Sequence, residues 1–357
     1  MPSRERTLTA LDRRKPDRVP FDALRHEQVQ ELIAQMDLPE EARQWYAEGD
    51  FRYVRFAGNR DAKMFEPYLP DLPEDASVND WGVGRVALKS VEGFHAGYRL
   101  HHPLAQVDSV AALEAYPFPD YAAPWRYERV ADDARRSRED DFVVIGQMSQ
   151  TILETAYEMR GIDRLMMDFY ERPEYVETLF EKIAERRRFQ AKIYAESGCD
   201  VLRIGDDIAT QTGLLVSPQM YRQWIEPHHA KVIEIARSVK PDIHVLYHSD
   251  GKLTPLLPDL IEIGVTAVNP CQPECMDPAE VKSEFGRHLT LWGCTAVQSN
   301  FAHGDRASVL DEIRTRMRTV APGGGYVVQF INIVITDKVL ENLRAFFETF
   351  YEAAAYL

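Results

Sequence analysis

The chain has 357 residues, and 45% of them are hydrophobic, which is enough to bury one large core or two smaller ones. Its 42 Lys and Arg residues stand against 57 Asp and Glu residues, giving a formal net charge of -15. This balance excludes binding of nucleic acid or of an anionic membrane over a broad face, while a local basic pocket stays open.

The sequence has no apolar leader at its start and no uncharged stretch long enough to span a membrane, so we expect a cytoplasmic protein. Its four cysteines, at positions 199, 271, 275 and 294, are too few for a disulfide framework in a chain of this length. Reduced thiols are therefore expected, and reduced thiols are free to bind a metal.

Short β-like runs alternate with long amphipathic segments along the chain. Eight runs are expected to form strands, at residues 18–23, 51–56, 142–146, 200–204, 243–247, 266–269, 289–292 and 326–330. Helices are expected to start at Pro173 and at Ser217-Pro218, because serine caps a helix and proline fits its first turn. Strands that alternate with helices in this way pair in parallel.

Eight such units predict a (β/α)8 barrel of the TIM type, formed by a single domain over residues 1–357. One long interruption, at about 57–141 between strands two and three, contains patterns that suggest an inserted hairpin with helices. A doubly wound open sheet is the alternative. No predicted strand is followed by a Gly-rich dinucleotide fingerprint, so a nucleotide cofactor is not expected.

The carboxyl ends of all strands meet at one face of a barrel, and that face carries the active site. The residues there are Asp22, Arg25, Gln147, Asp206, Asp207, His248, Asp250, Asn269, Cys271, Gln272, Cys294, Ile331 and Asn332. One of the adjacent pair Asp206 and Asp207 is expected to close a turn or cap a helix, because neighbouring residues of a strand point to opposite faces.

Zinc prefers nitrogen and sulfur ligands in a tetrahedron and keeps one position open in catalytic sites. His248 with Cys294 and either Cys271 or Asp250 would meet this requirement. No CxxC or HExxH signature accompanies them, and a buried cysteine also serves as a small hydrophobic residue. Two interpretations of these residues therefore remain: they bind zinc, or they pack in the hydrophobic core.

The chain resembles the uroporphyrinogen decarboxylase superfamily, a group of barrels that includes methyltransferases working with corrinoid and thiol carriers. The resemblance is carried by seven stretches of the sequence, at residues 15–20, 154–161, 205–213, 217–221, 248–251, 263–270 and 323–326, and by Glu341-Asn342. It spans nearly the whole chain and implies the same barrel fold.

Two activities follow from this resemblance. The decarboxylases hold the carboxylates of a tetrapyrrole with several arginines after the first strand, and here only Arg25 matches. The methyltransferases bind zinc through a His-x-Cys pair and a cysteine after the last strand. This chain has His248-Ser249-Asp250 at the first place and Ile331-Asn332 at the second.

The resemblance thus implies a zinc-dependent methyltransferase that acts on a small methylated substrate, with the corrinoid supplied by a partner protein and with a homodimer as the assembly. The expected metal ligands are His248, Asp250, Cys271 and Cys294. The catalytic candidates are Asp206, Asp207, His248 and Arg25. The expected substrate contacts are Gln147, Tyr157, Asn269, Gln272 and Asn332. A metal-free decarboxylase or lyase for a small acid or a tetrapyrrole is the first alternative. A non-catalytic barrel that binds a small molecule is the second.

The end of the sequence predicts one more helix, at 339–356, whose leucines and phenylalanines recur at helical spacing. This stripe predicts that the helix packs onto the barrel.

Overall fold

The computed structural model describes residues 1–88, 97–148 and 150–355. The barrel strands are β1 (Phe21–Asp22), β2 (Phe51–Val54), β6 (Val143–Gln147), β7 (Val201–Gly205), β8 (His244–His248), β9 (Ala267–Asn269), β10 (Thr290–Trp292) and β11 (Tyr326–Gln329). They pair in parallel in the order β1-β11-β10-β9-β8-β7-β6-β2. The predicted barrel strands are confirmed, each within its predicted range or extended by one residue at the carboxyl end.

Asp50, just before β2, joins the two ends of this sheet. Its backbone N–H donates to the carbonyl of Phe21 at 2.9 Å, and its carboxylate accepts from the Phe21 N–H at 2.8 Å. Both bonds link the start of β2 to β1, and β1 already pairs with β11. The sheet is therefore nearly closed into a (β/α)8 barrel.

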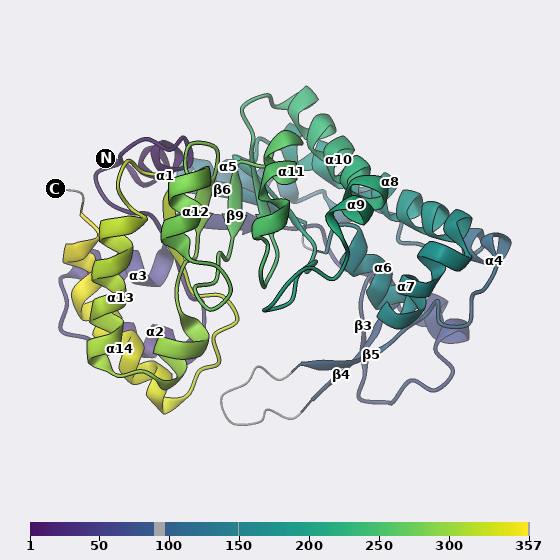
Figure 1. The fold of residues 1–357 in the computed structure, drawn as a ribbon, viewed down its shortest axis with the longest axis horizontal. Coiled ribbons are helices and arrows are strands. Elements are labelled where there is room, and N and C mark those ends of the chain that lie inside the picture. The colour runs from purple at the N-terminus through teal and green to yellow at the C-terminus, as the bar shows by residue number, and fades with distance from the viewer. Residues whose placement is uncertain (89–96, 149, 356–357) are drawn as a thin grey trace.

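The helices cover the outside of the barrel and both sides of its open end (Figure 1). They are α1 (Ser3–Leu11), α2 (Glu27–Gln35), α3 (Glu40–Glu48), α4 (Val110–Glu114), α5 (Val130–Glu139), α6 (Leu153–Arg160), α7 (Ile162–Glu171), α8 (Pro173–Glu196), α9 (Pro218–Met220), α10 (Glu226–Val239), α11 (Leu257–Glu262), α12 (Pro278–Phe285), α13 (Arg306–Thr319) and α14 (Asp337–Ala353). Among the described residues, none of these helices has the length and apolar character needed to cross a membrane.

The expected insertion lies between β2 and β6. It contains a small antiparallel sheet of β3 (Ser77–Val78), β4 (Gly84–Ala87) and β5 (Tyr98–His101), with α4 and α5 following. In Figure 1, β4 and β5 project beside the open end of the barrel, across from α13 and α14. The insertion thus supplies one wall of the space above the strand ends.

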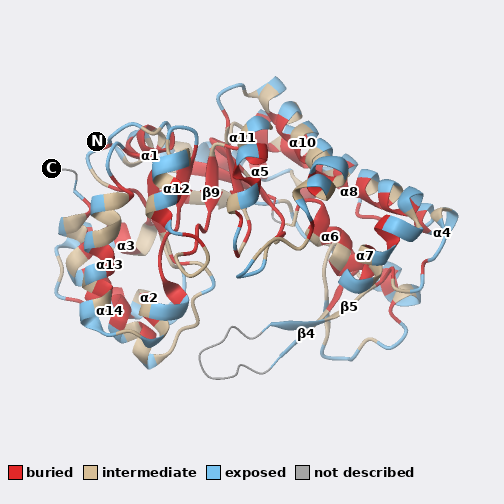
Figure 2. Ribbon diagram, viewed as in Figure 1, coloured by how far each residue is buried: buried red, intermediate tan, exposed pale blue. Residues whose placement is uncertain are grey.

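Hydrophobic side chains form two layers, one outside the strands and one within the barrel. Figure 2 shows buried residues along the strands and exposed ones on the outer faces of the surrounding helices. The inner layer consists of Leu11, Phe51, Val143, Ile145, Val201, Leu246, Ala267, Trp292 and Val327. These residues fill the amino-terminal half of the barrel, and Leu11 of α1 reaches in from below. The carboxyl-terminal half of the interior is left to other side chains.

The last helix, α14, packs inward as its pattern predicts. Leu343, Phe346, Phe347 and Phe350 are all buried in the outer hydrophobic layer. Tyr356, at the end of the predicted helix, lies outside the described residues. The apolar stripe is therefore used within the chain, and a homodimer stays a prediction.

Candidate active site

The carboxyl-terminal half of the barrel interior is polar. Side chains alternate along a strand, so each residue two positions after a member of the inner apolar layer also points inward. Those residues are Tyr53, Gln147, Arg203, His248, Asn269 and Gln329, and Asp22 of β1 joins them. The barrel therefore changes from an apolar plug to a polar layer directly below its mouth.

A chain of hydrogen bonds in this layer has one unambiguous anchor. The Nδ2 of Asn269 donates to the backbone carbonyl of Trp292 at 3.1 Å, and a carbonyl can only accept. The same amide donates to Oε1 of Gln329 at 2.9 Å, and Nε2 of Gln329 donates to Asp22 at 2.6 Å. The Oδ1 of Asn269 is thereby turned toward His248.

This orientation fixes the tautomer of His248. Its Nδ1 lies 2.7 Å from Oδ1 of Asn269 and must donate to it. Burial lowers the pKa of His248 to about 4, with the charge of Arg203 lowering it further, against opposing effects of Asp207 and Asn269. His248 is therefore neutral at physiological pH, and the lone pair of its Nε2 is available to a metal or a proton.

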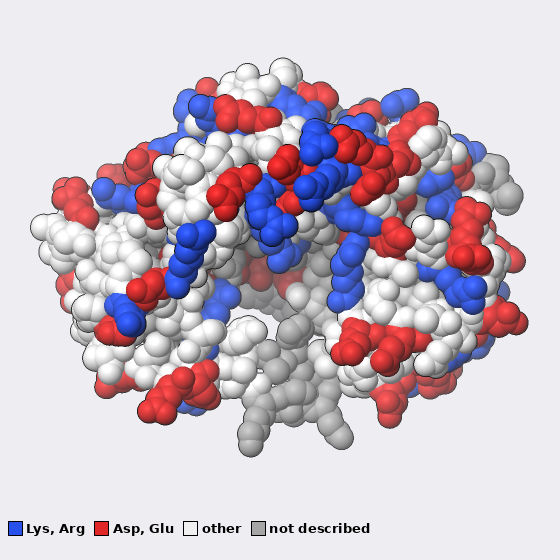
Figure 3. All heavy atoms as spheres, turned by 180° about the vertical axis from the view of Figure 1, so that it is seen from behind, with Lys and Arg blue, Asp and Glu red and all other residues white. Residues whose placement is uncertain are grey.

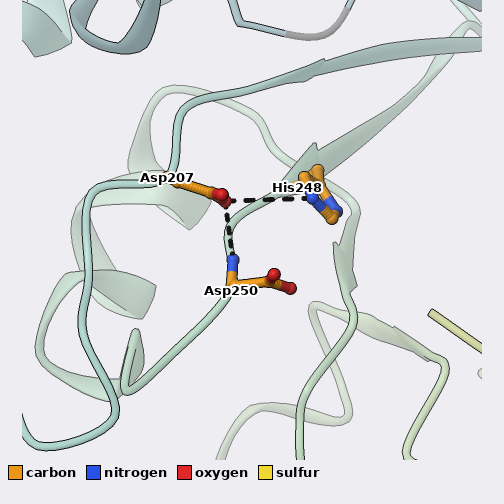
Figure 4. A group of neighbouring side chains, drawn as sticks. All are labelled: Asp207, His248 and Asp250. Atoms are coloured by element: carbon orange, nitrogen blue, oxygen red, sulfur yellow. Dashed lines mark hydrogen bonds and ion pairs between the residues drawn. The ribbon is translucent and has the colours of Figure 1, made fainter. Parts of the chain in front are cut away.

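Two carboxylates lie beside that nitrogen (Figure 4). The Nε2 of His248 is 3.8 Å from Oδ1 of Asp207, and the same oxygen accepts from the backbone N–H of Asp250 at 2.9 Å. One ligand atom each from Asp207, His248 and Asp250 lies within 4.8 Å of the other two. Three groups that could ligate one ion thus come together from the ends of two neighbouring strands.

Asp250 carries the clearest sign of a missing positive partner. Its Oδ1 is buried without a hydrogen bond, while its other oxygen accepts from Nδ2 of Asn332. Burial raises the pKa of Asp250 to about 7, and the negative charge of Asp207 adds to this effect. A buried carboxylate oxygen without a donor is costly, and a cation at this position would remove that cost.

Gly205 makes the close approach of β7 and β8 feasible. Its φ is +155°, and a Cβ at this position would lie 2.1 Å from the carbonyl oxygen of His248. No other residue could pass so close to that backbone. The glycine before Asp206-Asp207 therefore allows β8 to bring His248 next to Asp207.

As expected, only one of the adjacent residues Asp206 and Asp207 faces the site. The structure corrects the prediction that Asp206 is catalytic. Asp206 is fully buried and accepts from the backbone N–H groups at the start of α6, the nearest at 2.9 Å from Ile152. His229 Nε2 lies 2.9 Å from its other oxygen. All its lone pairs point into the fold, so Asp206 holds α6 against β7 and only Asp207 faces the site.

A second acidic pair lies behind Asp207, on α6. Glu154 accepts from the backbone N–H of Asp207 at 3.0 Å, and burial, followed by the charges of Asp207 and Asp206, raises the pKa of Glu154 to about 8. Glu158 pairs with Arg85 of β4 at 2.6 Å. Glu154 is therefore largely protonated at neutral pH, and Arg85 ties the inserted hairpin to the barrel.

A cavity of about 760 Å³ lies next to the acidic residues of the site. Asp207, Asp250 and Asn332 line it, and Arg85 and Tyr98 close it from the hairpin. Seen from behind, the molecule is hollowed between its two halves, with acidic side chains in the depth of the hollow (Figure 3). Two members of the Asp207–His248–Asp250 group, Asp207 and Asp250, line this cavity, which has room for a small organic molecule.

Neither cysteine joins this group, which corrects the prediction that Cys271 or Cys294 ligates a metal with His248. In the part of the chain that the structure describes, no other three His, Cys, Asp or Glu side chains come as close together. Both cysteines have positive φ, 46° and 58°, which breaks the alternation that would point them inward, and both are buried in the outer apolar layer. Burial and the neighbouring Cys271 raise the pKa of Cys294 well above its usual value, so it stays a neutral thiol.

The other predicted residues are scattered. Arg25 is exposed, donates to the carbonyl of Glu48 at 3.0 Å and does not line the cavity, so a catalytic role for it is not supported. Gln272 is buried and accepts from the Gly251 N–H at 2.7 Å, holding the turn after His248.

Gln147 and Tyr157 also lie away from the cavity lining. Gln147 accepts from Arg55 at 3.0 Å and borders a smaller pocket of about 250 Å³. Tyr157 packs on α6 behind the site, where burial and the charge of Glu154 raise its pKa. Asn332 alone of the predicted substrate contacts lines the cavity.

Sequence reasoning passed over Arg203, Arg85 and Gln329. The sequence does contain a signal for two of them. Arg203 is a charged residue within the otherwise apolar run Val201-Leu-Arg-Ile204, and Gln329 is the polar last residue of Tyr326–Gln329. Arg85 lies far from the barrel strands in sequence, and no local pattern marks its contact with Glu158.

Comparison with known proteins agrees with this architecture. The family model "Uroporphyrinogen decarboxylase (URO-D)" matches residues 91–353. The uroporphyrinogen decarboxylase of Synechocystis sp. is 23% identical over 254 residues, which cover 69% of this chain and 67% of that protein. A methyltransferase from Methanosarcina mazei has the same fold, with a TM-score of 0.61 at 17% identity over 99% of this chain and 98% of that one.

Proposed function

Since the chain belongs to the uroporphyrinogen decarboxylase family, we propose that it is a zinc-dependent methyltransferase, which moves a methyl group between a small methylated substrate and a corrinoid or thiol carrier. The observation that carries the proposal is the group Asp207, His248 and Asp250 beside the cavity. The methyltransferase from Methanosarcina mazei, which has the same fold, supports the reaction class.

The donor set fits zinc. One imidazole nitrogen and two carboxylate oxygens would occupy three tetrahedral positions and leave the fourth to the substrate. The buried, unpaired Oδ1 of Asp250 and the free lone pair of His248 Nε2 are the atoms that a cation would satisfy. Asp207, at the end of β7, would supply the third ligand in a chain that has Ile331-Asn332 where the methyltransferases of this superfamily have a cysteine after the last strand.

Bound there, zinc would act as a Lewis acid on the heteroatom that carries the methyl group. Other residues of the chain would orient the ligands and hold the substrate. Asn269 keeps the Nδ1–H of His248 occupied, so Nε2 always faces the site. Asn332 holds one oxygen of Asp250 and leaves the other free. The cavity above them would hold the substrate, and the corrinoid would come from a partner protein.

The test is methyl transfer to a free corrinoid that stands in for the partner. Purified protein would be incubated with cob(I)alamin and a panel of small O-, N- and S-methyl compounds, and methylcobalamin would be followed by its absorbance. We expect turnover with at least one compound, abolished by His248→Ala and by a chelator, and unchanged in Cys294→Ser. Transfer that persists at full rate in His248→Ala would refute the proposal.

A metal-free decarboxylase or lyase for a small acid is the second candidate. It is favoured by the pKa of about 7 at Asp250, which suits a general acid or base, and by the similarity to a uroporphyrinogen decarboxylase. A tetrapyrrole with many carboxylates fits less well, because the described residues that line the cavity include Glu158, Asp207 and Asp250 against one arginine, Arg85, and one histidine, His303. Carbon dioxide release that survives complete chelation would favour this candidate.

A further inference from the structure

Arg203 lies in the barrel interior without a hydrogen-bond or ion-pair partner for its side chain among the described residues. It lies on β7, two residues after Val201 of the inner apolar layer, and its Cα pairs in register with Gln147 on one side and Leu246 on the other. Leu202 and Ile204, on either side of it in sequence, belong to the outer layer. The guanidinium of Arg203 therefore points into the polar layer just below the mouth, deeper than the residues that line the cavity.

Within the described residues, no hydrogen bond or ion pair holds the Arg203 side chain, and its Nε is buried without an acceptor. Other arginines around the mouth are engaged: Arg85 pairs with Glu158 at 2.6 Å, and Arg55 donates to Gln147 at 3.0 Å. A partly buried cation without a partner destabilises a fold unless something outside the chain neutralises it.

Asp22, His248 and Asp250 are close enough to Arg203 for its charge to act on them. Yet neither Asp22 nor Asp250 is within the 4.0 Å of an ion pair with it. Asp22 instead accepts from Tyr53 at 2.5 Å and from Gln329 at 2.6 Å.

We propose that Arg203 binds a carboxylate of the substrate, so that the substrate is a small methylated carboxylic acid anchored by its acid group inside the barrel. The methyl-bearing end would then reach Asp207, His248 and Asp250. The identity of the methyl-bearing end rests on the proposed function above, whereas the anchoring of a carboxylate by Arg203 does not.

A carboxylate suits this position better than a phosphate. Its two oxygens match the planar fork of a guanidinium and can accept two parallel hydrogen bonds. It also brings a single negative charge, whereas a phosphate brings up to two into a region that already contains Asp22 in the polar layer and Asp207 and Asp250 at the mouth. The polar layer is narrow as well, because the side chains of eight strands converge there.

The experiment measures binding of acetate and methoxyacetate by calorimetry, with the neutral methoxyacetamide for comparison. We expect both anions to bind the wild type and methoxyacetamide to bind at least tenfold more weakly. In Arg203→Gln the affinity for the anions should fall about 10- to 100-fold, as expected when a charge-assisted pair is lost. Arg203→Lys keeps the charge without the fork and should fall between the two.

Two control variants distinguish anion binding by Arg203 from binding by a surface arginine or by a metal ion. Arg25→Gln removes an exposed rim arginine and should leave anion binding unchanged. His248→Ala removes a proposed metal ligand, and acetate binding that persists there assigns the anion to Arg203 and not to a metal ion. The measurement of acetate binding in His248→Ala is informative even when no metal and no methyl transfer are found. The proposal for Arg203 and the proposed methyltransferase activity can therefore fail separately.

Stability distinguishes a binding arginine from a structural one. Arg203→Met should unfold at the same or higher denaturant concentration than the wild type, since it removes a cation without a partner. Two results would overturn the proposal: neither anion binding the wild type, or Arg203→Gln binding both as tightly as the wild type does. Loss of folding in Arg203→Met together with retained binding in Arg203→Lys at wild-type strength would make Arg203 a structural residue.

Discussion

The Nδ1 of His248 lies 2.7 Å from the Oδ1 of Asn269, and the carbonyl of Trp292 on the far side of that amide leaves it only one orientation. The imidazole is thereby presented to the cavity with its Nε2 lone pair outward. A hydrogen bond of this kind orients many metal-binding histidines and raises their affinity for the ion.

Replacing Asn269 should therefore weaken the metal site without touching a ligand. We expect Asn269→Leu to bind zinc about 10- to 100-fold more weakly in a chelator competition titration. Asn269→Asp keeps an acceptor for Nδ1–H and should stay within a few-fold of the wild type. Equal zinc affinity in Asn269→Leu and the wild type would show that this amide does not position His248.

Adjacent residues Asp206 and Asp207 should behave in opposite ways when mutated. Asp206→Asn places an N–H₂ group against the backbone donors of α6 and breaks the pair with His229, so the free energy of unfolding should fall by about 3 kcal/mol. Asp207→Asn relieves repulsion with Asp250 and should change it by less than about 1 kcal/mol. Denaturant unfolding of both variants checks this, and similar losses in the two would mean that the structural and site roles are not divided.

Asp22 should make stability depend on pH. Burial raises the pKa of Asp22 from 3.8 to about 6, so the folded state holds a proton that the unfolded chain releases earlier. The stability that comes from Asp22 is present below about pH 4 and is lost as pH rises toward and through 6, by about 3 kcal/mol in full.

Asp22→Asn removes this titration. Between pH 5 and pH 7 the free energy of unfolding of the wild type should therefore fall by about 1 kcal/mol more than that of Asp22→Asn. Denaturant titrations at both pH values measure the difference. Parallel changes in the two proteins would place the Asp22 pKa near its ordinary value.

The fold was predictable because its signals are repetitive. Alternation of strand and helix patterns located the barrel strands β1, β2 and β6–β11, and the hairpin of the insertion was visible in the runs around Val86 and Tyr98. The strand-end rule also placed Asp207, His248 and Asp250 on one face, where the structure brings them together.

The errors of site prediction have two physical origins. Cys271 and Cys294 follow β9 and β10, but positive φ at both turns their side chains to the outer layer, and no propensity rule for cysteine predicts such a backbone. Arg203 lies before the end of its strand, so a survey restricted to strand ends misses it. Side-chain direction beyond the last regular residue depends on tertiary packing.

The most direct test of the account is the metal content of protein purified without a chelating tag. Elemental analysis should find about one zinc per chain in the wild type and in Cys294→Ser, because the cysteine is not a ligand. His248→Ala and Asp250→Asn should each lose most of it while remaining folded. A wild type that takes up no metal even when supplied with zinc, or a His248→Ala variant that keeps its zinc, would contradict the assignment of Asp207, His248 and Asp250 as a metal centre.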